Sequence, residues 1–284
     1  MKYVLFQPPQ HLKELVQCFW SLESDQDEVM PAEYYLMADS CAEIIFQYNG
    51  GFQSYSKQSA RIRFQHSTHN KFLVEKELGF FGVRLYPNAV NKLLSMPATE
   101  VANCVFDLSY LFRQKGSDLA DQVFNAKSSA ERVARVSDFL LQNAAGKKGD
   151  PIDHFVDQII KLEGQLDISH LQQQSGLSVK QFERRFKAIA GFTPKYFARV
   201  IRFQSAKQKY CSPKINTLTE LAYECNYYDQ SHFIREFREF SGVQPHHYFK
   251  FLKKEKVSST PNKIIVPPAD RSRYDGYLPC GWFV

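Results

Sequence analysis

Two short stretches of this chain carry basic and polar side chains in nearly the same order. They run from Ser178 to Pro194 (SVKQFERRFKAIAGFTP) and, 51 residues later, from Asp229 to Pro245 (DQSHFIREFREFSGVQP). In each stretch Phe recurs at i and i+4, which predicts an amphipathic helix with the Phe side chains buried and the charged side chains on the open face. Basic groups on such a face can neutralise phosphates, and neighbouring Gln, Ser or Glu side chains can bond to base edges.

The candidate DNA-contacting residues are the open-face positions of these two helices. The first turns of a recognition helix usually meet base edges, and later basic residues more often meet phosphate. The alternative for each position is a charged helix face that is only solvated. In the first helix the candidates are Lys180, Gln181, Glu183, Arg184 and Lys187; in the second they are Gln230, Ser231, His232, Ile234, Arg235 and Arg238, with Lys187 and Arg238 expected at phosphate.

Each of these helices is preceded by a shorter one, expected over 168–175 and 218–225. Capping boxes of the S-x-x-Q and T-x-x-E type are predicted at Ser178 and Thr217. A helix, a tight turn and a basic helix form the helix-turn-helix pattern, whose second helix enters the major groove of DNA. Thr193-Pro194 starts a further helix that runs to about Tyr210 and joins the two units. The sequence therefore predicts two helix-turn-helix units in an all-α domain.

Residues 152–250 resemble the DNA-binding domain of AraC/XylS-type transcriptional regulators. The segments SGLSVKQFERRFKAIAGFTPKYFARVIRFQSA and LTELAYECNYYDQSHFIREFREFSGVQP carry the resemblance. It implies two helix-turn-helix units joined by a long helix, on which Arg199 and Arg202 are candidates to bridge the units. There are two departures from the family pattern: Asn226 stands where Gly is usual, and Gln172 stands where a small Ala is usual. Asn tolerates the left-handed backbone conformation, so we expect the turn at Asn226 to be kept.

The first 145 residues predict an α+β domain in which strands come before helices. Strands are expected at 43–48, 52–55, 61–64, 72–74 and 79–86, and helices at 89–95, 108–112 and 129–144. We expect a small β-barrel or cupin-like sheet with helices appended. The stretch resembles an uncharacterised N-terminal domain found in one subgroup of these regulators, through Trp20, Asp39-Ser40-Cys41 and GVRLYPNAVNKLLSMPATEV. In the wider family such domains sense ligands or dimerise.

Composition sets the expected domain boundaries. Small, charged, Gly- and Pro-rich residues predict a linker at 146–151, between a regulatory domain at 1–145 and a DNA-binding domain at 152–254. Residues 255–284 begin as a polar linker but end with several aromatic side chains, which disordered tails rarely contain. We therefore expect this extension to dock on the protein.

Arg84 lies inside an apolar strand, and a buried Arg needs an anionic partner. Two alternatives remain open: an Asp or Glu of the chain, or the carboxylate or phosphate of a bound ligand in a pocket lined by Trp20, Tyr34 and Tyr35. His66 and His69 lack a third ligand at diagnostic spacing, so we predict a surface loop and no metal site.

The overall composition favours a cytoplasmic DNA-binding protein over an enzyme. The net charge is +6, and nine basic residues between Lys180 and Lys209 face only one acidic residue, which indicates a phosphate-facing surface. Six scattered Cys are expected to be reduced, and neither an export signal nor a membrane-spanning stretch is expected. No motif for catalysis or for cofactor binding stands out.

Double-stranded DNA is accordingly the expected partner of a transcriptional activator or repressor. RNA polymerase, a small-molecule effector and a second copy of the chain are further candidate partners. The alternatives are an architectural DNA-binding protein with a structural N-terminal domain, and a Cys-based DNA-repair regulator. The latter would need clustered reactive Cys, whereas Cys18, Cys41 and Cys104 lie far apart in sequence.

Overall fold

The computed structural model describes residues 2–23, 32–49, 58–74, 79–144, 149–210, 215–250 and 282–283. The N-terminal half contains a six-stranded antiparallel sheet in the order β1-β2-β7-β4-β5-β8. Its strands are β1 (Lys2–Phe6), β2 (Val16–Glu23), β7 (Gly79–Leu85), β4 (Ala42–Asn49), β5 (Ser59–Arg63) and β8 (Val105–Asp107). The strands predicted at 43–48, 61–64 and 79–86 are therefore found within one or two residues.

A second antiparallel sheet has the order β6-β3-β9. It consists of β6 (Asn70–Val74), β3 (Ala32–Leu36) and β9 (Trp282–Phe283). The α+β class is confirmed, with the described strands forming two open sheets rather than a closed barrel. The strand predicted at 52–55 lies outside the described residues. Docking of the C-terminal extension stays a prediction, although the backbone of β9 pairs with that of β3.

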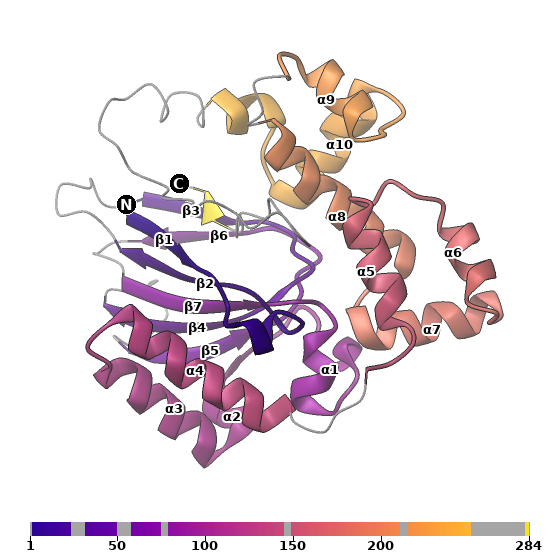
Figure 1. Ribbon diagram of the computed structural model, residues 1–284. Coiled ribbons are helices and arrows are strands. Elements are labelled where there is room, and N and C mark those ends of the chain that lie inside the picture. The colour runs from indigo at the N-terminus through magenta and orange to yellow at the C-terminus, as the bar shows by residue number, and fades with distance from the viewer. Residues whose placement is uncertain are drawn as a thin grey trace.

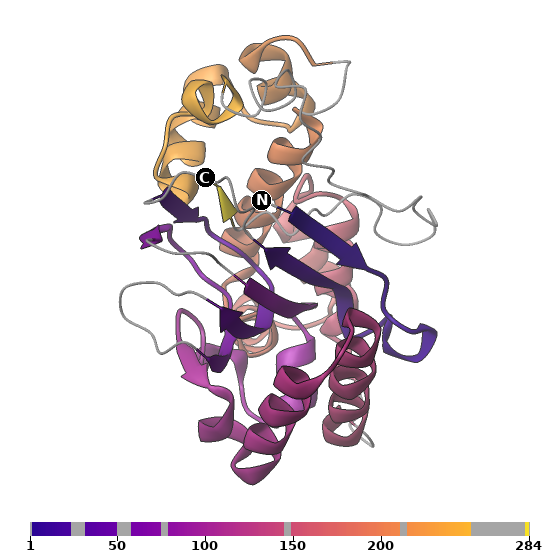
Figure 2. The same cartoon turned by 90° about the vertical axis from the view of Figure 1, so that its left-hand side faces the viewer.

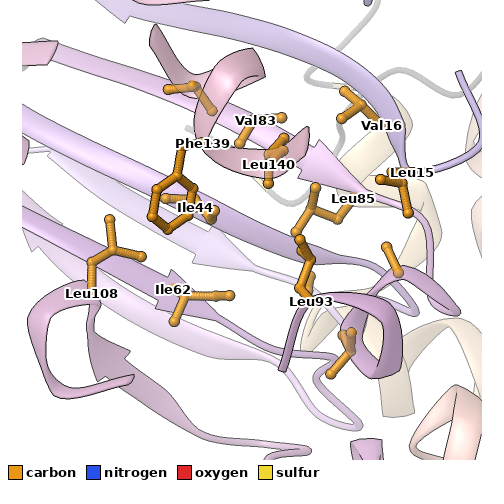
Figure 3. Packing of buried hydrophobic residues seen from close by; sticks show 14 of the residues in the cluster. Leu15, Val16, Ile44, Ile62, Val83, Leu85, Leu93, Leu108, Phe139 and Leu140 are labelled. Atoms are coloured by element: carbon orange, nitrogen blue, oxygen red, sulfur yellow. The ribbon is translucent and has the colours of Figure 1, made fainter. Parts of the chain in front are cut away.

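The N-terminal core lies between one face of the six-stranded sheet and a layer of helices. Side chains alternate along β7, so Phe81, Val83 and Leu85 face this core while Gly82 and Arg84 face the other way. Figure 3 shows Val83 near Leu140 and Leu85 near Leu93, two leucines of the helical layer. The layer comprises α1 (Ala89–Leu94), α2 (Leu108–Phe112), α3 (Gln114–Asn125) and α4 (Ser129–Ala144), and short 3₁₀ turns occur at η1 (Gln10–Leu12) and η2 (Ala98–Glu100).

The described residues between 152 and 250 form an all-α region. Its helices are α5 (Asp153–Lys161), α6 (Ile168–Gln174), α7 (Val179–Ala190), α8 (Pro194–Lys209), α9 (Leu218–Glu224) and α10 (Gln230–Ser241). Figures 1 and 2 show these helices beside the ends of the sheet strands, with α2, α3 and α4 along one face of the larger sheet. No helix among the described residues is long and apolar enough to span a bilayer.

The local signals of both helix-turn-helix units are present. Ser178 and Thr217 form the predicted capping boxes with Gln181 and Glu220, and Gly191 and Gly242 end α7 and α10 in the left-handed conformation. Both departures from the family pattern are accommodated: Asn226 takes the left-handed conformation with φ 55°, and the Gln172 side chain donates a 2.5 Å hydrogen bond to the Leu177 carbonyl of the first turn.

Candidate nucleic-acid interface

The open face of α7 carries the first set of predicted contact residues. Phe182 and Phe186 are buried, which turns Lys180, Gln181, Glu183, Arg184 and Lys187 outward, all five of them exposed. Four of the five have no hydrogen-bond or ion-pair partner in the described part of the chain. The exception is Gln181, whose side-chain oxygen accepts from the Ser178 backbone N–H as part of the capping box at 3.1 Å. The side-chain amide oxygen of Gln181 therefore already accepts a hydrogen bond within the protein.

The open face of α10 has the same plan with different side chains. Phe233 and Phe237 are fully buried, and Gln230, Ser231, Arg235 and Arg238 are exposed. Gln230 accepts a 2.8 Å hydrogen bond from the Thr219 hydroxyl, which ties α9 to α10. The remaining two candidates are half-buried: His232 packs edge-on against Tyr227, and Ile234 packs against the core of the second unit. Ser231, Arg235 and Arg238 are therefore the residues most available on this helix.

A groove runs beside α10 on this open side. Its wall includes Gln244, which the sequence analysis did not single out and which lies in the turn after the α10 C-cap. Gln244 lies directly before Pro245, as Thr193 lies directly before Pro194 in the first unit, and this repeat could have signalled it. The groove is lined by Ser231, Ile234, Arg235, Arg238, Glu239 and Gln244.

The prediction that the basic residues between Lys180 and Lys209 form a phosphate-facing surface is wrong for some of them. Of the nine basic residues between Lys180 and Lys209, four pair with carboxylates: Arg185 with Asp150, Arg199 and Arg202 with Glu236, and Lys209 with Glu163. Lys207 is buried, with its ammonium 3.8 Å from the Met37 sulfur. Several of these basic residues lie on α8, which packs against other elements on most sides, so their charges meet carboxylates instead of solvent. The exposed remainder is Lys180, Arg184, Lys187 and Lys195.

Arg199 and Arg202, the candidates to bridge the two units, both contact the second unit. Both reach Glu236, a buried carboxylate on α10, at 2.7 and 3.5 Å. Arg202 also stacks over the Tyr227 ring and donates to the Asn226 carbonyl at 3.5 Å. These bonds attach the joining helix α8 to the second recognition helix and to the turn before it.

Arg84 finds its anionic partners within the chain. Its guanidinium donates to both Asp39 oxygens, at 2.5 and 2.6 Å, and to Glu43 at 2.9 Å, with all three side chains almost fully buried. Glu43 also pairs with buried Arg63. Burial opposes the charged form of Asp39, but the Arg84 charge and hydrogen bonds outweigh it and lower the Asp39 pKa to about 2. Of the two alternatives for Arg84, the carboxylates of the chain are the one observed.

The other predicted pocket residues do not surround a free guanidinium. Trp20 is buried against Gly82, where an added Cβ would lie 2.5 Å from the indole ring, and it stacks on Tyr3. Tyr34 and Tyr35 lie on β3, in register with Phe72 and Lys71 of β6. A ligand pocket at this place stays a prediction.

One predicted loop histidine and three cysteines are buried in the described part of the chain. His66 is buried, against the predicted surface loop, because its backbone pairs with Asp39 and its Nδ1 bonds to the Phe64 carbonyl oxygen. Among the described residues no group of three or more His, Cys, Asp or Glu side chains could hold a metal ion. Burial raises the pKa of Cys18, Cys41 and Cys225 to about 12, so these thiols stay protonated at neutral pH.

Two helix-turn-helix units with exposed recognition helices, joined by one long helix, define the class: a DNA-binding domain of the double helix-turn-helix kind. Residues 171–250 match the profile of a helix-turn-helix domain, and residues 5–107 match a domain of unknown function, DUF6597. The chain therefore carries an AraC-type helix-turn-helix domain behind a DUF6597 domain.

Several known proteins are similar to parts of this chain. The probable transcriptional regulator LumQ of Photobacterium leiognathi is 28% identical over 102 residues, which are 36% of this chain and 40% of LumQ. The chain thus spans less than half the length of this curated relative. Crystal structures with a loose likeness include ToxT from Vibrio cholerae (9% identity, 82% of this chain and 98% of that one, TM-score 0.48). Another is the DNA-binding domain of AdpA with a target DNA (22% identity, 39% and 99%, TM-score 0.35).

Proposed function

We propose that this protein is a sequence-specific DNA-binding transcriptional regulator that acts in the cytoplasm. Its recognition helices α7 and α10 enter successive major grooves on one face of the duplex. The observation that carries the proposal is the repeated open face: two capped helices of 12 residues each present exposed basic and polar side chains, while their Phe faces are buried. The joining helix α8 has 16 residues and is thus ~24 Å long, which suits recognition helices about one turn of DNA apart, roughly 34 Å.

The residue roles follow from exposure. Lys180, Glu183 and Arg184 on α7 and Ser231 and Arg235 on α10 are proposed to meet base edges. Lys187 and Arg238, one turn further on, are proposed to neutralise phosphates. Gln181, Gln230 and His232 remain candidates for DNA contact, but their side chains are less available, since each already has a partner inside its own unit.

The test is selection of bound duplexes from random sequence with the full chain, followed by affinity measurements across a salt series. We expect enrichment of a site with two separated halves and an affinity that falls linearly on a log–log plot, by ~0.9 per neutralised phosphate. Binding to all duplexes alike, with the same salt slope and no enriched site, would instead support the architectural alternative. Absence of binding would reject both.

Arg235→Ala is expected to weaken binding to the selected site by about 1–3 kcal/mol and to relax base preference at one position. The reason is that Arg235 is exposed in the groove beside α10, where a guanidinium can bond to guanine in a bidentate way. Arg185→Ala is the matched control, because it removes the same charge from α7 but from a side chain that pairs with Asp150. A base preference for Arg235→Ala that is the same as for the unmodified protein would reject the base-reading role.

Cys18 and Cys41 do not supply the reactive thiolate of the Cys-based repair alternative. It requires a reactive thiolate, and burial holds the Cys18 and Cys41 thiols protonated, with pKa values of about 12. RNA polymerase, a small-molecule effector and a homodimer stay predictions.

A further inference from the structure

A segment of the N-terminal domain is built into the core of the second helix-turn-helix unit. Met37 and Ala38, which follow β3, are each 1% exposed and belong to the same apolar cluster as Phe237 and Phe240 of α10. The Ala38 amide donates a 2.9 Å hydrogen bond to the Phe240 carbonyl in the last turn of α10. The second unit is therefore completed by residues that lie more than 170 positions earlier in the chain.

The same segment is bonded to the joining helix α8. Gln204 of α8 is buried, donates to an Asp39 carboxylate oxygen at 2.9 Å and accepts from the Ser40 hydroxyl at 3.4 Å. The two terminal guanidinium nitrogens of Arg84, on the N-terminal sheet, also donate to the Asp39 carboxylate. Gln204 thus bonds to a carboxylate that the N-terminal sheet already fixes in place.

Further contacts reach the joining helix and the second unit from a second part of the N-terminal domain. The Tyr196 hydroxyl, on α8, donates to the Ser67 carbonyl at 2.6 Å, and His69 Nδ1 lies 3.2 Å from the Glu239 carbonyl oxygen of α10. At the end of α10 a Cβ on Gly242 would lie only 2.4 Å from the His69 ring.

The first unit meets the N-terminal domain at the end of its recognition helix. Gly191, the C-cap of α7, lies beside Gln65, Ala98 and Ala102, with van der Waals room for a Cβ. The N-terminal domain therefore touches the C-terminal ends of both recognition helices and the helix between them.

These contacts leave the DNA-reading faces open. Lys180, Arg184, Arg235 and Arg238 are all exposed while the two domains are in contact. The N-terminal domain therefore does not cover the DNA-reading faces of the recognition helices. What it restricts is the movement of one helix-turn-helix unit relative to the other.

We propose that the N-terminal domain is a brace that fixes the spacing and orientation of the two helix-turn-helix units, and that the Asp39–Gln204 contact is its latch. The inference rests on the proposed function. A rigid pair of units binds both halves of a site as one ligand, whereas loosened units bind the second half at a lower effective concentration. The brace therefore acts on binding to paired half-sites and leaves each recognition helix able to bind its own half.

The test is Gln204→Glu in the full chain, which places a second carboxylate against Asp39 in a buried contact. We expect exchange of the Ala38 amide, measured by hydrogen exchange, to become about tenfold faster or more, since this amide bonds across the interface. Affinity for the selected two-half site should fall about 10- to 100-fold. Affinity for a duplex in which one half is replaced by unrelated sequence should stay within about twofold.

The matched control is Gln208→Glu, which adds the same charge one turn further along α8 at a half-buried position. In the described part of the chain Gln208 has no hydrogen bond to the N-terminal domain, so both readouts should remain unchanged. Gln204→Leu removes both hydrogen bonds without adding charge and leaves Asp39 paired with Arg84. It decides the question if Gln204→Glu does not fold.

Three outcomes would overturn the brace. They are unchanged Ala38 exchange in both Gln204 variants, faster exchange with unaltered two-half affinity, and equal losses on the two-half and one-half duplexes. These outcomes presuppose that the unmodified protein binds a selected two-half site. Lack of such binding would count against the proposed function itself and is seen before any variant is made.

Discussion

Replacing Arg84 with Met is expected to lower the free energy of unfolding of the N-terminal domain by about 3–5 kcal/mol. The guanidinium donates to Asp39 and Glu43, and all three side chains are almost fully buried, so its removal leaves two carboxylates in the interior with too little positive charge. Arg63 pairs with Glu43 and can compensate only part of this. The measurement is the midpoint and slope of urea unfolding, followed by tryptophan fluorescence, because Trp20 lies on the same sheet face.

Arg135→Met is the control for loss of one positive charge. Arg135 pairs with Glu131 one turn away on α4, where both side chains are well exposed, and such surface pairs contribute little to stability. Equal unfolding midpoints for the Arg84 and Arg135 variants would contradict the view that Arg84 holds the two buried carboxylates. Loss of Arg84 should also speed exchange of the Ala38 amide, since Asp39 would no longer be fixed against Gln204.

Acid is expected to destabilise the protein steeply between about pH 4 and pH 2. Burial disfavours the charged form of Asp39, yet Arg84 and Arg63 lower its folded-state pKa to about 2, below the value of 3.8 for an unperturbed Asp. A carboxyl group whose pKa is lower in the folded state stabilises the fold above its unfolded pKa. That contribution is lost as the pH falls through the folded pKa, and it amounts to roughly 2–3 kcal/mol here.

Urea unfolding at a series of pH values between 6 and 2 measures this contribution. Asp39→Asn should be less stable at neutral pH but should lose less stability on acidification than the unmodified protein. Asp107→Asn, which alters a surface pair with Arg61, should keep the original slope. An Asp39→Asn variant with the full acid slope would assign the slope to other carboxylates.

Local patterns were sufficient for the DNA-binding half. Phe at i and i+4, two capping boxes, a Gly C-cap and Thr-Pro starts all act within one or two turns of chain, so the sequence predicts α6 to α10 within one or two residues. Even the departure at Asn226 follows from local sterics, because Asn accepts the left-handed conformation that the turn requires.

Fewer elements of the N-terminal half could be predicted from the sequence. Strands β1, β2, β3 and β8 and helix α3 were not predicted. In β2 the run VQCFWSLE is buried on both faces over most of its length, so it lacks the alternation that marks a half-exposed strand. An alternating apolar and polar pattern identifies strands with one solvent-exposed face, and it misses strands that are buried on both faces.

What the sequence by itself determined is which helices form and which of their faces are apolar, because those properties depend on neighbours a few residues apart. Only the tertiary structure decided which charges remain free for DNA. Arg199, Arg202 and Lys209 look like phosphate contacts in a linear list, yet they meet carboxylates brought in from α10 and from other parts of the domain. The partners of Arg84 and Gln204 lie 45 and 165 positions from them, and no short-range pattern selects one acidic residue among 30 at such separations.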